Sequence, residues 1–286
     1  MKVLVTGVTG QLGYDVAKEL ERRHIEYKGV GSKDMDLTVP SEVEKVVAAY
    51  HPDAVIHCAA WTAVDAAEET ENISKVHAVN ANGTKYIAEA CKKINAKMLY
   101  ISTDYVFNGQ GTKPWEPDDR NYKPLNVYGQ TKLEGELAVS ERLSKYFIVR
   151  IAWVFGKNGN NFVKTMLKVG KTHDTLRVVN DQIGTPTYTY DLARLLVDMV
   201  ETNKYGYYHA TNEGEFISWY DFACEIFRQA GYTTKVIPVT TEEYGLSKAK
   251  RPFNSRLDKS KLMENGFKPL PDWNDALKRY LTEIRK

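Results

Sequence analysis

Val3-Leu4-Val5-Thr6-Gly7-Val8-Thr9-Gly10-Gln11-Leu12-Gly13 is the stretch that decides the fold. It opens with a short continuous apolar run, which is typical of a strand buried on both faces of a parallel sheet. Three glycines follow with the spacing Gly-x-x-Gly-x-x-Gly, and Leu12, Val16 and Leu20 then recur at the spacing of a helix face. A strand, a tight turn and a helix in this order predict the start of a parallel α/β sheet.

The next 140 residues repeat this alternation of strands and helices. Strands are expected at residues 26–30, 54–58, 98–102 and 147–151. Helices are expected from Pro40 or Ser41 to Tyr50, over a long segment that carries Val76, Val79, Ile87, Cys91 and Ile94, and around residues 128–132. Such alternation predicts a doubly wound parallel sheet of the Rossmann type, with helices on both faces.

The alternation becomes less regular after residue 152. Helices are expected at 162–169, 190–200 and 219–230, and a strand at 175–179. We therefore expect a dinucleotide-binding domain of residues 1–152 plus about 183–205. A smaller mixed α/β domain, of about 153–182 plus 206–286, is expected to bind the substrate.

Composition narrows the functional classes. The chain has 39 basic and 37 acidic residues, a net charge of +2, and no basic stripe, so nucleic acid is not an expected partner. No apolar stretch approaches the roughly 20 residues of a membrane helix, and no secretory signal precedes the first strand. Cys58, Cys91 and Cys224 are scattered without metal-ligand spacing, which favours reduced cysteines, no metal and a cytoplasmic location.

The glycine turn favours a nucleotide site because the backbone at Gly7, Gly10 and Gly13 can approach a pyrophosphate at the N-terminus of the following helix. A glycine turn without a ligand is the alternative. The second strand ends at Gly31-Ser32-Lys33 with no carboxylate at its tip. Ser32 and Lys33 suit the 2′-phosphate of NADPH, although Lys33 is also compatible with an ordinary loop lysine. Acceptance of NADH stays open. Asp36-Leu37 lies where a carboxylate can meet the adenine amino group.

Tyr128 and Lys132 are four residues apart, so on a helix the phenol and the ammonium lie on the same face. A free tyrosine has a pKa of about 10. A nearby cation stabilises the phenolate and lowers that pKa, which makes proton transfer efficient near neutral pH. Thr103 follows a strand end, at the edge where open parallel sheets bind ligands. Two solvated side chains are the alternative for the Tyr-x-x-x-Lys spacing alone.

The chain resembles the extended short-chain dehydrogenase/reductase superfamily across essentially its whole length. The segments that carry the resemblance keep one order along the chain: 6–13, 58–65, 102–107, 126–129, 153–156, 159–162, 180–187 and 251–255. It implies that Tyr128 donates a proton, that Lys132 holds the nicotinamide ribose and that Thr103 binds the reacting oxygen. It further implies cofactor contacts from Gln11, Leu12, Ala60, Trp61 and Thr62, and substrate contacts from Val64, Asp104, Trp153, Asn161, Gln182, Arg251 and Asn254.

Within that superfamily, the resemblance implies NADPH-dependent reduction of the 4-keto group of dTDP-4-dehydro-β-L-rhamnose to dTDP-β-L-rhamnose, an activated sugar for surface polysaccharide. Two other functions stay open: an epimerase or dehydratase of nucleotide sugars with tightly held NAD, and a regulatory NADP-binding subunit like the beta subunit of methionine adenosyltransferase. Some members dimerise around magnesium held by glutamates. Asp15 and Tyr190 stand at those positions here, so we expect a monomer or weak homodimer.

Overall fold

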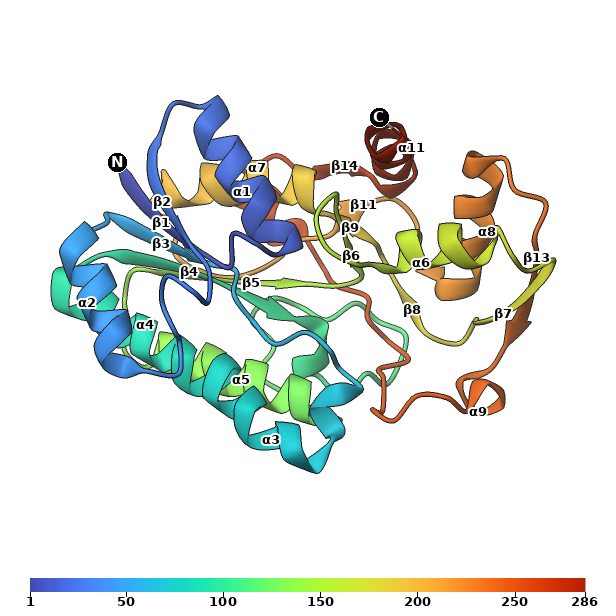
Figure 1. Ribbon diagram of the computed structural model, residues 1–286, viewed down its shortest axis with the longest axis horizontal. Helices are drawn as coiled ribbons and strands as arrows, with labels where there is room; N and C mark the ends of the chain where they lie inside the picture. The colour runs from blue at the N-terminus through green and yellow to red at the C-terminus, as the bar shows by residue number, and fades with distance from the viewer. Residues whose placement is uncertain (286) are drawn as a thin grey trace.

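The computed structural model describes residues 1–285. Its central sheet has six parallel strands in the order β10-β5-β4-β3-β1-β2 (Figure 1). These strands are β1 (Lys2–Thr6), β2 (Glu26–Val30), β3 (Ala54–His57), β4 (Lys97–Thr103), β5 (Tyr146–Ile151) and β10 (Gly206–His209). The chain builds outward from β1 to β2 on one side and then returns to β3 on the other. The carboxyl ends of β1 and β3 therefore flank the crevice in which such sheets bind ligands.

Helices cover both faces of the sheet, which confirms the doubly wound prediction (Figure 1). One face carries α1 (Gln11–Arg22) and α7 (Thr189–Val200), which contact each other. The other face carries α2 (Pro40–Tyr50), α4 (Thr84–Ile94) and α5 (Val127–Ser140). Each layer has its own apolar core, one around Val16 and Leu196 and the other around Val47 and Ile87. Strands β1 and β3 are buried on both faces, as their continuous apolar runs predict, whereas the edge strand β2 is partly exposed.

The long helix expected between β3 and β4 has three segments: α3 (Thr70–His77), a π-helical turn η2 (Ala78–Gly83) and α4. The π turn contains Asn80, whose side chain accepts from the Trp61 N–H at 2.7 Å and donates to the Trp61 carbonyl at 3.1 Å. Gly83 lies against Leu37, where a Cβ would come within 2.9 Å of the leucine side chain. The turn thus fixes the segment that follows β3, and π turns are frequent at functional sites.

A smaller lobe packs beside the carboxyl ends of the strands (Figure 1). Its core joins α6 (Phe162–Val169), α8 (Trp219–Ala230) and α11 (Trp273–Ile284), next to the parallel pair β7 (Thr175–Val179) and β13 (Lys235–Val239). The remaining elements are short: β6 (Val154–Phe155), β8 (Ile183–Gly184), β9 (Thr187–Tyr188), β11 (Asn212–Glu213), β12 (Ile217–Ser218), β14 (Leu270–Asp272), α9 (Thr241–Tyr244), α10 (Ser260–Glu264), η1 (Ala66–Glu68) and η3 (Asp104–Val106).

The lobe boundary expected at residue 206 needs correction. β10 begins there and pairs with β5 as the sixth strand of the central sheet. Leu262, Phe267 and Leu270 also belong to the core beneath α7. The sequence signal was weak, because Gly206-Tyr-Tyr-His209 is only four residues long and mixes a glycine and a histidine with two tyrosines. Within residues 1–285, no helix is long and apolar enough to cross a bilayer.

Candidate active site

A cleft of about 880 Å³ opens at the carboxyl ends of the strands, between the sheet and the smaller lobe. Residues from β1, β2, β3, β4 and β5, or from the loops directly after them, line it. Most of the residues predicted from the sequence to be functional line this cleft: Gly7, Gly10, Gln11, Leu12, Gly13, Ser32, Asp36, Leu37, Ala60, Thr62, Val64, Thr103, Asp104, Tyr128, Lys132 and Trp153.

The glycine turn closes one end of the cleft. Gly7 has φ +71°, and a Cβ on it would lie 2.7 Å from the Ala59 backbone nitrogen. A Cβ on Gly13 would overlap the Gly7 carbonyl. Gly10 precedes α1, whose first turn has neither a side-chain cap nor an acidic residue. The free N–H groups and the helix dipole therefore face the cleft, as a bound diphosphate requires.

The residues at the tip of β2 are not all placed as the sequence predicted. Lys33 is exposed and does not line the cleft, whereas Gly31 and Ser32 do. A carboxylate is present at this tip, because Asp34 Oδ2 accepts a hydrogen bond from the Gly31 N–H at 2.8 Å. The Asp36 carboxylate accepts from the Thr38 N–H and hydroxyl at 2.8 and 2.7 Å, which lowers the pKa of Asp36. Asp36 still borders the cleft beside Leu37.

Tyr128 lies in the first turn of α5, whose start is fixed by two side chains. The Asn126 side chain accepts from the Gly129 N–H at 2.7 Å, and Glu68 Oε1 accepts from the Val127 N–H at 2.7 Å. A Cβ on Gly129 would overlap the Tyr105 carbonyl, so glycine allows α5 to approach η3 closely. This packing sets Tyr128 beside Thr103, the last residue of β4.

The predicted lowering of the Tyr128 pKa by Lys132 does not hold in this structure. Burial raises the pKa of Tyr128, the charge of Asp104 raises it further, and only Thr103 acts in the opposite direction. Lys132 has no part in that shift, because its ammonium donates to the Ile101 carbonyl at 2.6 Å and lies 4.1 Å from the centroid of the Tyr100 ring. Tyr128 is therefore fully protonated at neutral pH, the state that a proton donor needs.

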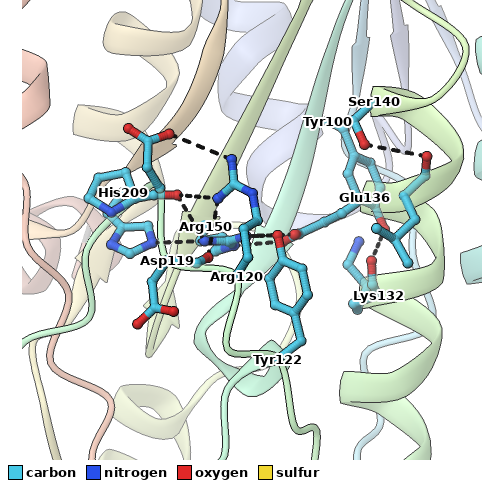
Figure 2. Close-up of polar contacts among 12 residues, drawn as sticks. Tyr100, Asp119, Arg120, Tyr122, Lys132, Glu136, Ser140, Arg150 and His209 are labelled. Carbon is cyan, nitrogen blue, oxygen red and sulfur yellow. Dashed lines mark hydrogen bonds and ion pairs between the residues drawn. The ribbon is translucent and has the colours of Figure 1, made fainter.

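Lys132 is only 3% exposed, and burial lowers its pKa to about 7, against the charge of Glu136. Glu136 is one helical turn further along α5 and forms a fully buried ion pair with Arg150 of β5. Arg150 Nε and an Nη bind the two Glu136 oxygens at 2.8 and 2.7 Å. Arg150 lies among Glu136, Tyr122 and His209 (Figure 2).

The Arg150–Glu136 pair was not predicted from the sequence. Two signals were present: Lys132 and Glu136 share a helix face, and Arg150 interrupts an otherwise apolar strand. A charged residue in a strand that is buried on both faces needs a partner of opposite charge. Only the three-dimensional structure identifies that partner.

Two tryptophans form the wall of the cleft on the side of the smaller lobe. Trp153 and Trp219 stack with ring centroids 3.8 Å apart and planes 14° apart, and both line the cleft. Trp153 has φ +50°, a left-handed conformation that is rare for a bulky residue and is typical of functional sites. Trp153 was predicted from the sequence as a substrate contact, whereas Trp219 was not, because its sequence context is that of the start of an ordinary amphipathic helix.

Besides Lys33, five of the expected ligand contacts do not line the cleft. Trp61 instead donates from its indole to the Ala63 carbonyl at 3.2 Å. Asn161 caps α6 and donates to Gln11, Gly156 and Tyr280. The other three also bind protein groups. The Gln182 side chain donates to the Thr241 hydroxyl, and the Asn254 side chain donates to the carbonyls of Gln110 and Lys113. The Arg251 guanidinium donates to the two Asp65 carboxylate oxygens at 3.0 and 2.6 Å. Their observed contacts are structural, and ligand binding by them stays a prediction.

The described residues contain no cluster of three or more His, Cys, Asp or Glu side chains that could hold a metal ion. Asp15 is buried and accepts a hydrogen bond from the Thr189 hydroxyl, and burial raises its pKa to about 6. Tyr190 is exposed on α7. Cys58, Cys91 and Cys224 are free thiols.

Comparison with known proteins adds relatives that match nearly the whole chain. A model of the RmlD substrate binding domain family matches residues 1–286. The spore coat polysaccharide biosynthesis protein SpsK of Bacillus subtilis is 41% identical over 282 residues, which cover 99% of this chain and 97% of that protein. The dTDP-4-dehydrorhamnose reductase of Aggregatibacter actinomycetemcomitans is 41% identical over 292 residues, with 97% of each chain covered. A solved structure of dTDP-4-dehydrorhamnose reductase from Bacillus anthracis, in complex with NADP, is similar with a TM-score of 0.94, 41% identity and 99% coverage of both chains.

Proposed function

Because the chain belongs to the RmlD substrate binding domain family, we propose that it is an NADPH-dependent oxidoreductase that converts dTDP-4-dehydro-β-L-rhamnose to dTDP-β-L-rhamnose. The observation that carries this proposal is the convergence of Thr103, Tyr128 and Lys132 on one cleft with the glycine turn. The name of the Aggregatibacter relative and the NADP complex of the Bacillus anthracis relative support the reaction and the cofactor. The name of SpsK supports a role in supplying sugar for surface polysaccharide.

The residues at the β1 and β2 ends of the cleft fit a dinucleotide phosphate. Bound NADPH supplies the hydride that reduces C4 of the sugar. The turn at Gly7, Gly10 and Gly13 would hold its diphosphate against the free N–H groups of α1. Ser32 in the cleft and the exposed Lys33 next to it would hold the 2′-phosphate, and Asp36 with Leu37 would border the adenine.

The chain's own acid and cation then complete the reaction. Tyr128 is protonated at neutral pH and donates its proton to O4 of the sugar. Lys132 holds the nicotinamide ribose and contributes positive charge, which is most effective where water is excluded. Thr103 binds the reacting oxygen. Val64, Asp104 and the Trp153–Trp219 wall would border the sugar. Arg251, whose guanidinium pairs with Asp65, is the group that we propose for its diphosphate.

NADPH consumption, followed by its absorbance, tests this function with dTDP-4-dehydrorhamnose and with UDP- and GDP-linked 4-keto sugars as comparisons. We expect oxidation of NADPH with the dTDP-linked sugar and much slower oxidation with the others. If NADPH is not consumed with any of these sugars, the reductase assignment is wrong. Stoichiometric NAD in the purified protein, with turnover that needs no NADPH, would instead favour an epimerase or dehydratase. Co-purification with a catalytic partner would favour a regulatory subunit.

We also infer that the protein acts as a monomer or weak homodimer without a metal bridge, and that it works in the cytoplasm. The burial of Asp15 and its hydrogen bond from Thr189 support the absence of a bridge, because this carboxylate is turned into the protein and not toward solvent. Light scattering after size exclusion, with and without a chelator, tests the assembly. A tight dimer that dissociates on chelation would contradict it.

A further inference from the structure

Asp104 is the most deeply buried carboxylate in the cleft, at 1% exposure. Its Oδ1 accepts a hydrogen bond from the Thr103 hydroxyl at 3.0 Å. Its Oδ2 is buried and has no hydrogen-bond partner among residues 1–285. The Thr103 hydroxyl also accepts from the Tyr105 N–H at 3.2 Å. A carboxylate and a hydroxyl that both border the substrate are thus joined by one hydrogen bond.

A threonine hydroxyl has a single proton to donate. While Asp104 is ionised, it holds that proton in a charge-assisted bond, which is stronger than a bond to a neutral ketone. Thr103 then has no proton for the reacting oxygen. Once Asp104 is protonated, its carboxyl group becomes a donor, and the Thr103 proton is free to turn toward the substrate.

We propose that Asp104 is a positioning residue whose own protonation decides whether Thr103 donates its proton to the reacting oxygen of the substrate. This inference rests on the proposed reductase function. The chemistry balances without any further reactant: the hydride goes to C4, the Tyr128 proton goes to O4, and Thr103 keeps its proton throughout.

The surroundings of Asp104 place this titration in an accessible pH range. Burial raises the pKa of Asp104 to about 6, while the hydroxyls of Thr103 and Ser255 act in the opposite direction. Tyr105 of η3 and Tyr128 of α5 face it, and both are neutral because burial raises their pKa values. Arg251, on the same segment as Ser255, is engaged by Asp65.

A second effect of protonating Asp104 also increases the rate of reduction. The ionised Asp104 raises the pKa of Tyr128, which makes the phenol a weaker proton donor. Protonation of Asp104 therefore strengthens both the proton donor and the hydrogen bond to the developing alkoxide. The reduction is expected to be fastest below about pH 6 and to slow as the pH rises through the titration of Asp104.

The test is a pH profile of kcat and kcat/KM for NADPH-dependent reduction. In the unmodified protein we expect a fall of about a hundredfold in kcat across this titration, similar to the loss of one oxyanion donor. Asp104→Asn, which is permanently neutral, is expected to lose this step and to keep only the later fall that belongs to Lys132. Thr103→Val is expected to lose the same step, because Asp104 then has no hydroxyl to control.

Ser255→Ala provides a variant outside the catalytic centre. Without the Ser255 hydroxyl the pKa of Asp104 rises, so the step is expected to move to higher pH. An unchanged step in the pH profile of Asp104→Asn would overturn the proposal. A change of KM alone at every pH in Asp104→Asn would also overturn it, because that result would show that Asp104 only contacts a sugar hydroxyl. Failure of the reductase function itself is distinguishable, since the unmodified protein would then be inactive at every pH.

Discussion

Lys132 has a pKa that differs strongly between the folded and unfolded chain. Burial lowers it from 10.5 to about 7 in the folded protein. Between these two values the unfolded chain binds more protons, so the contribution of this group to stability rises as the pH rises through that range. Below about pH 7 the penalty for burying the charged ammonium is present in full. The active-site lysine therefore lowers the stability of the fold that carries it.

Replacement of Lys132 by Met should raise stability and remove activity. The apolar side chain has a similar length and avoids the desolvation penalty. We expect Tm at pH 7 to rise by roughly 5 °C, with the difference shrinking toward pH 10 as the unmodified lysine becomes neutral in both states. Calorimetry over this pH range measures the effect, with Lys18→Met, an exposed lysine of α1, as the control. A lower Tm for Lys132→Met would contradict it.

Tyr128→Phe removes only the phenolic hydroxyl. Because Tyr128 is the proton donor in the proposed reaction, kcat should fall by about 10²- to 10⁴-fold. Binding of NADPH, measured by fluorescence titration, should stay near normal. Tyr205→Phe loses an exposed hydroxyl far along the chain and should keep full activity. Normal turnover by Tyr128→Phe would refute the role of this residue.

At the scale of elements, the sequence predicted best where one pattern fills a whole element. Strand 26–30 and helices 162–169 and 219–230 begin and end at the expected residues, because their apolar spacing is regular and bounded by clear caps or turns. The π turn between α3 and α4 could not be predicted, because its cause is the distant backbone at Trp61, which Asn80 binds. β10 was missed for a similar reason, since its pairing with β5 decides its structure.

The glycine turn gives a matched pair of substitutions. Gly7 and Gly231 have similar positive φ angles, +71° and +77°, but only Gly7 lies against other atoms. Alanine at either position strains the backbone by about 1–2 kcal/mol. Only Gly7→Ala should also weaken NADPH binding, by at least about tenfold, which corresponds to 1.4 kcal/mol. Titration of both variants with NADPH tests this. Equal affinities would show that the close packing of Gly7 against Ala59 is not needed for NADPH binding.

The proposed role of the β2 tip in cofactor preference can be tested by a change of charge. Lys33→Glu replaces a cation near the 2′-phosphate by an anion, next to the Asp34 carboxylate on Gly31. The ratio of kcat/KM for NADPH to that for NADH should fall by about tenfold or more. Lys28→Glu, an exposed lysine within the same strand, serves as the control. An unchanged ratio in Lys33→Glu would show that Lys33 is an ordinary loop residue.

At the scale of the whole molecule, two ion pairs join the segment after α9 to the loop after β3. Arg251 pairs with Asp65, and Lys248 pairs with Glu69. Asp65 also accepts from the Ala249 N–H at 3.0 Å. On the other side of the cleft, the Asn158 side chain donates to the Thr9 carbonyl at 2.7 Å. The two lobes are thus linked on both sides of the cleft.

Arg251 has two candidate roles, linking the lobes or binding the substrate diphosphate, and paired variants separate them. We expect Arg251→Gln to raise KM for the sugar nucleotide by about tenfold, the loss of one charged hydrogen-bonding group. Asp65→Asn should change KM by less than about threefold, since the guanidinium stays available. Initial-rate kinetics measure both. Equal increases of KM would show that Arg251 acts only through its pair with Asp65.

The candidate site was predictable where it depends on strand order along the chain. Thr103 and the glycine turn were expected near each other because the carboxyl ends of parallel strands meet at one edge. The contribution of Trp219 and the partner of Arg150 were not predictable, because both depend on how distant segments pack. Asn161 and Asn254 illustrate the converse: polar residues within a family motif are here engaged in capping a helix and fixing a loop.

The buried pair of Arg150 and Glu136 has a consequence for the response of the enzyme to ionic strength. Both side chains are fully buried, and Glu136 is one helical turn beyond Lys132, so dissolved ions screen their charges only weakly. Asp65 and Arg251 are 44% and 22% exposed, so their attraction weakens as the screening length shortens to about 8 Å at physiological salt. Added salt should therefore change how the lobes hold a charged substrate while the pH response of Lys132 stays constant. In a cell whose internal salt varies, capture of the substrate would vary and the acid–base chemistry would not.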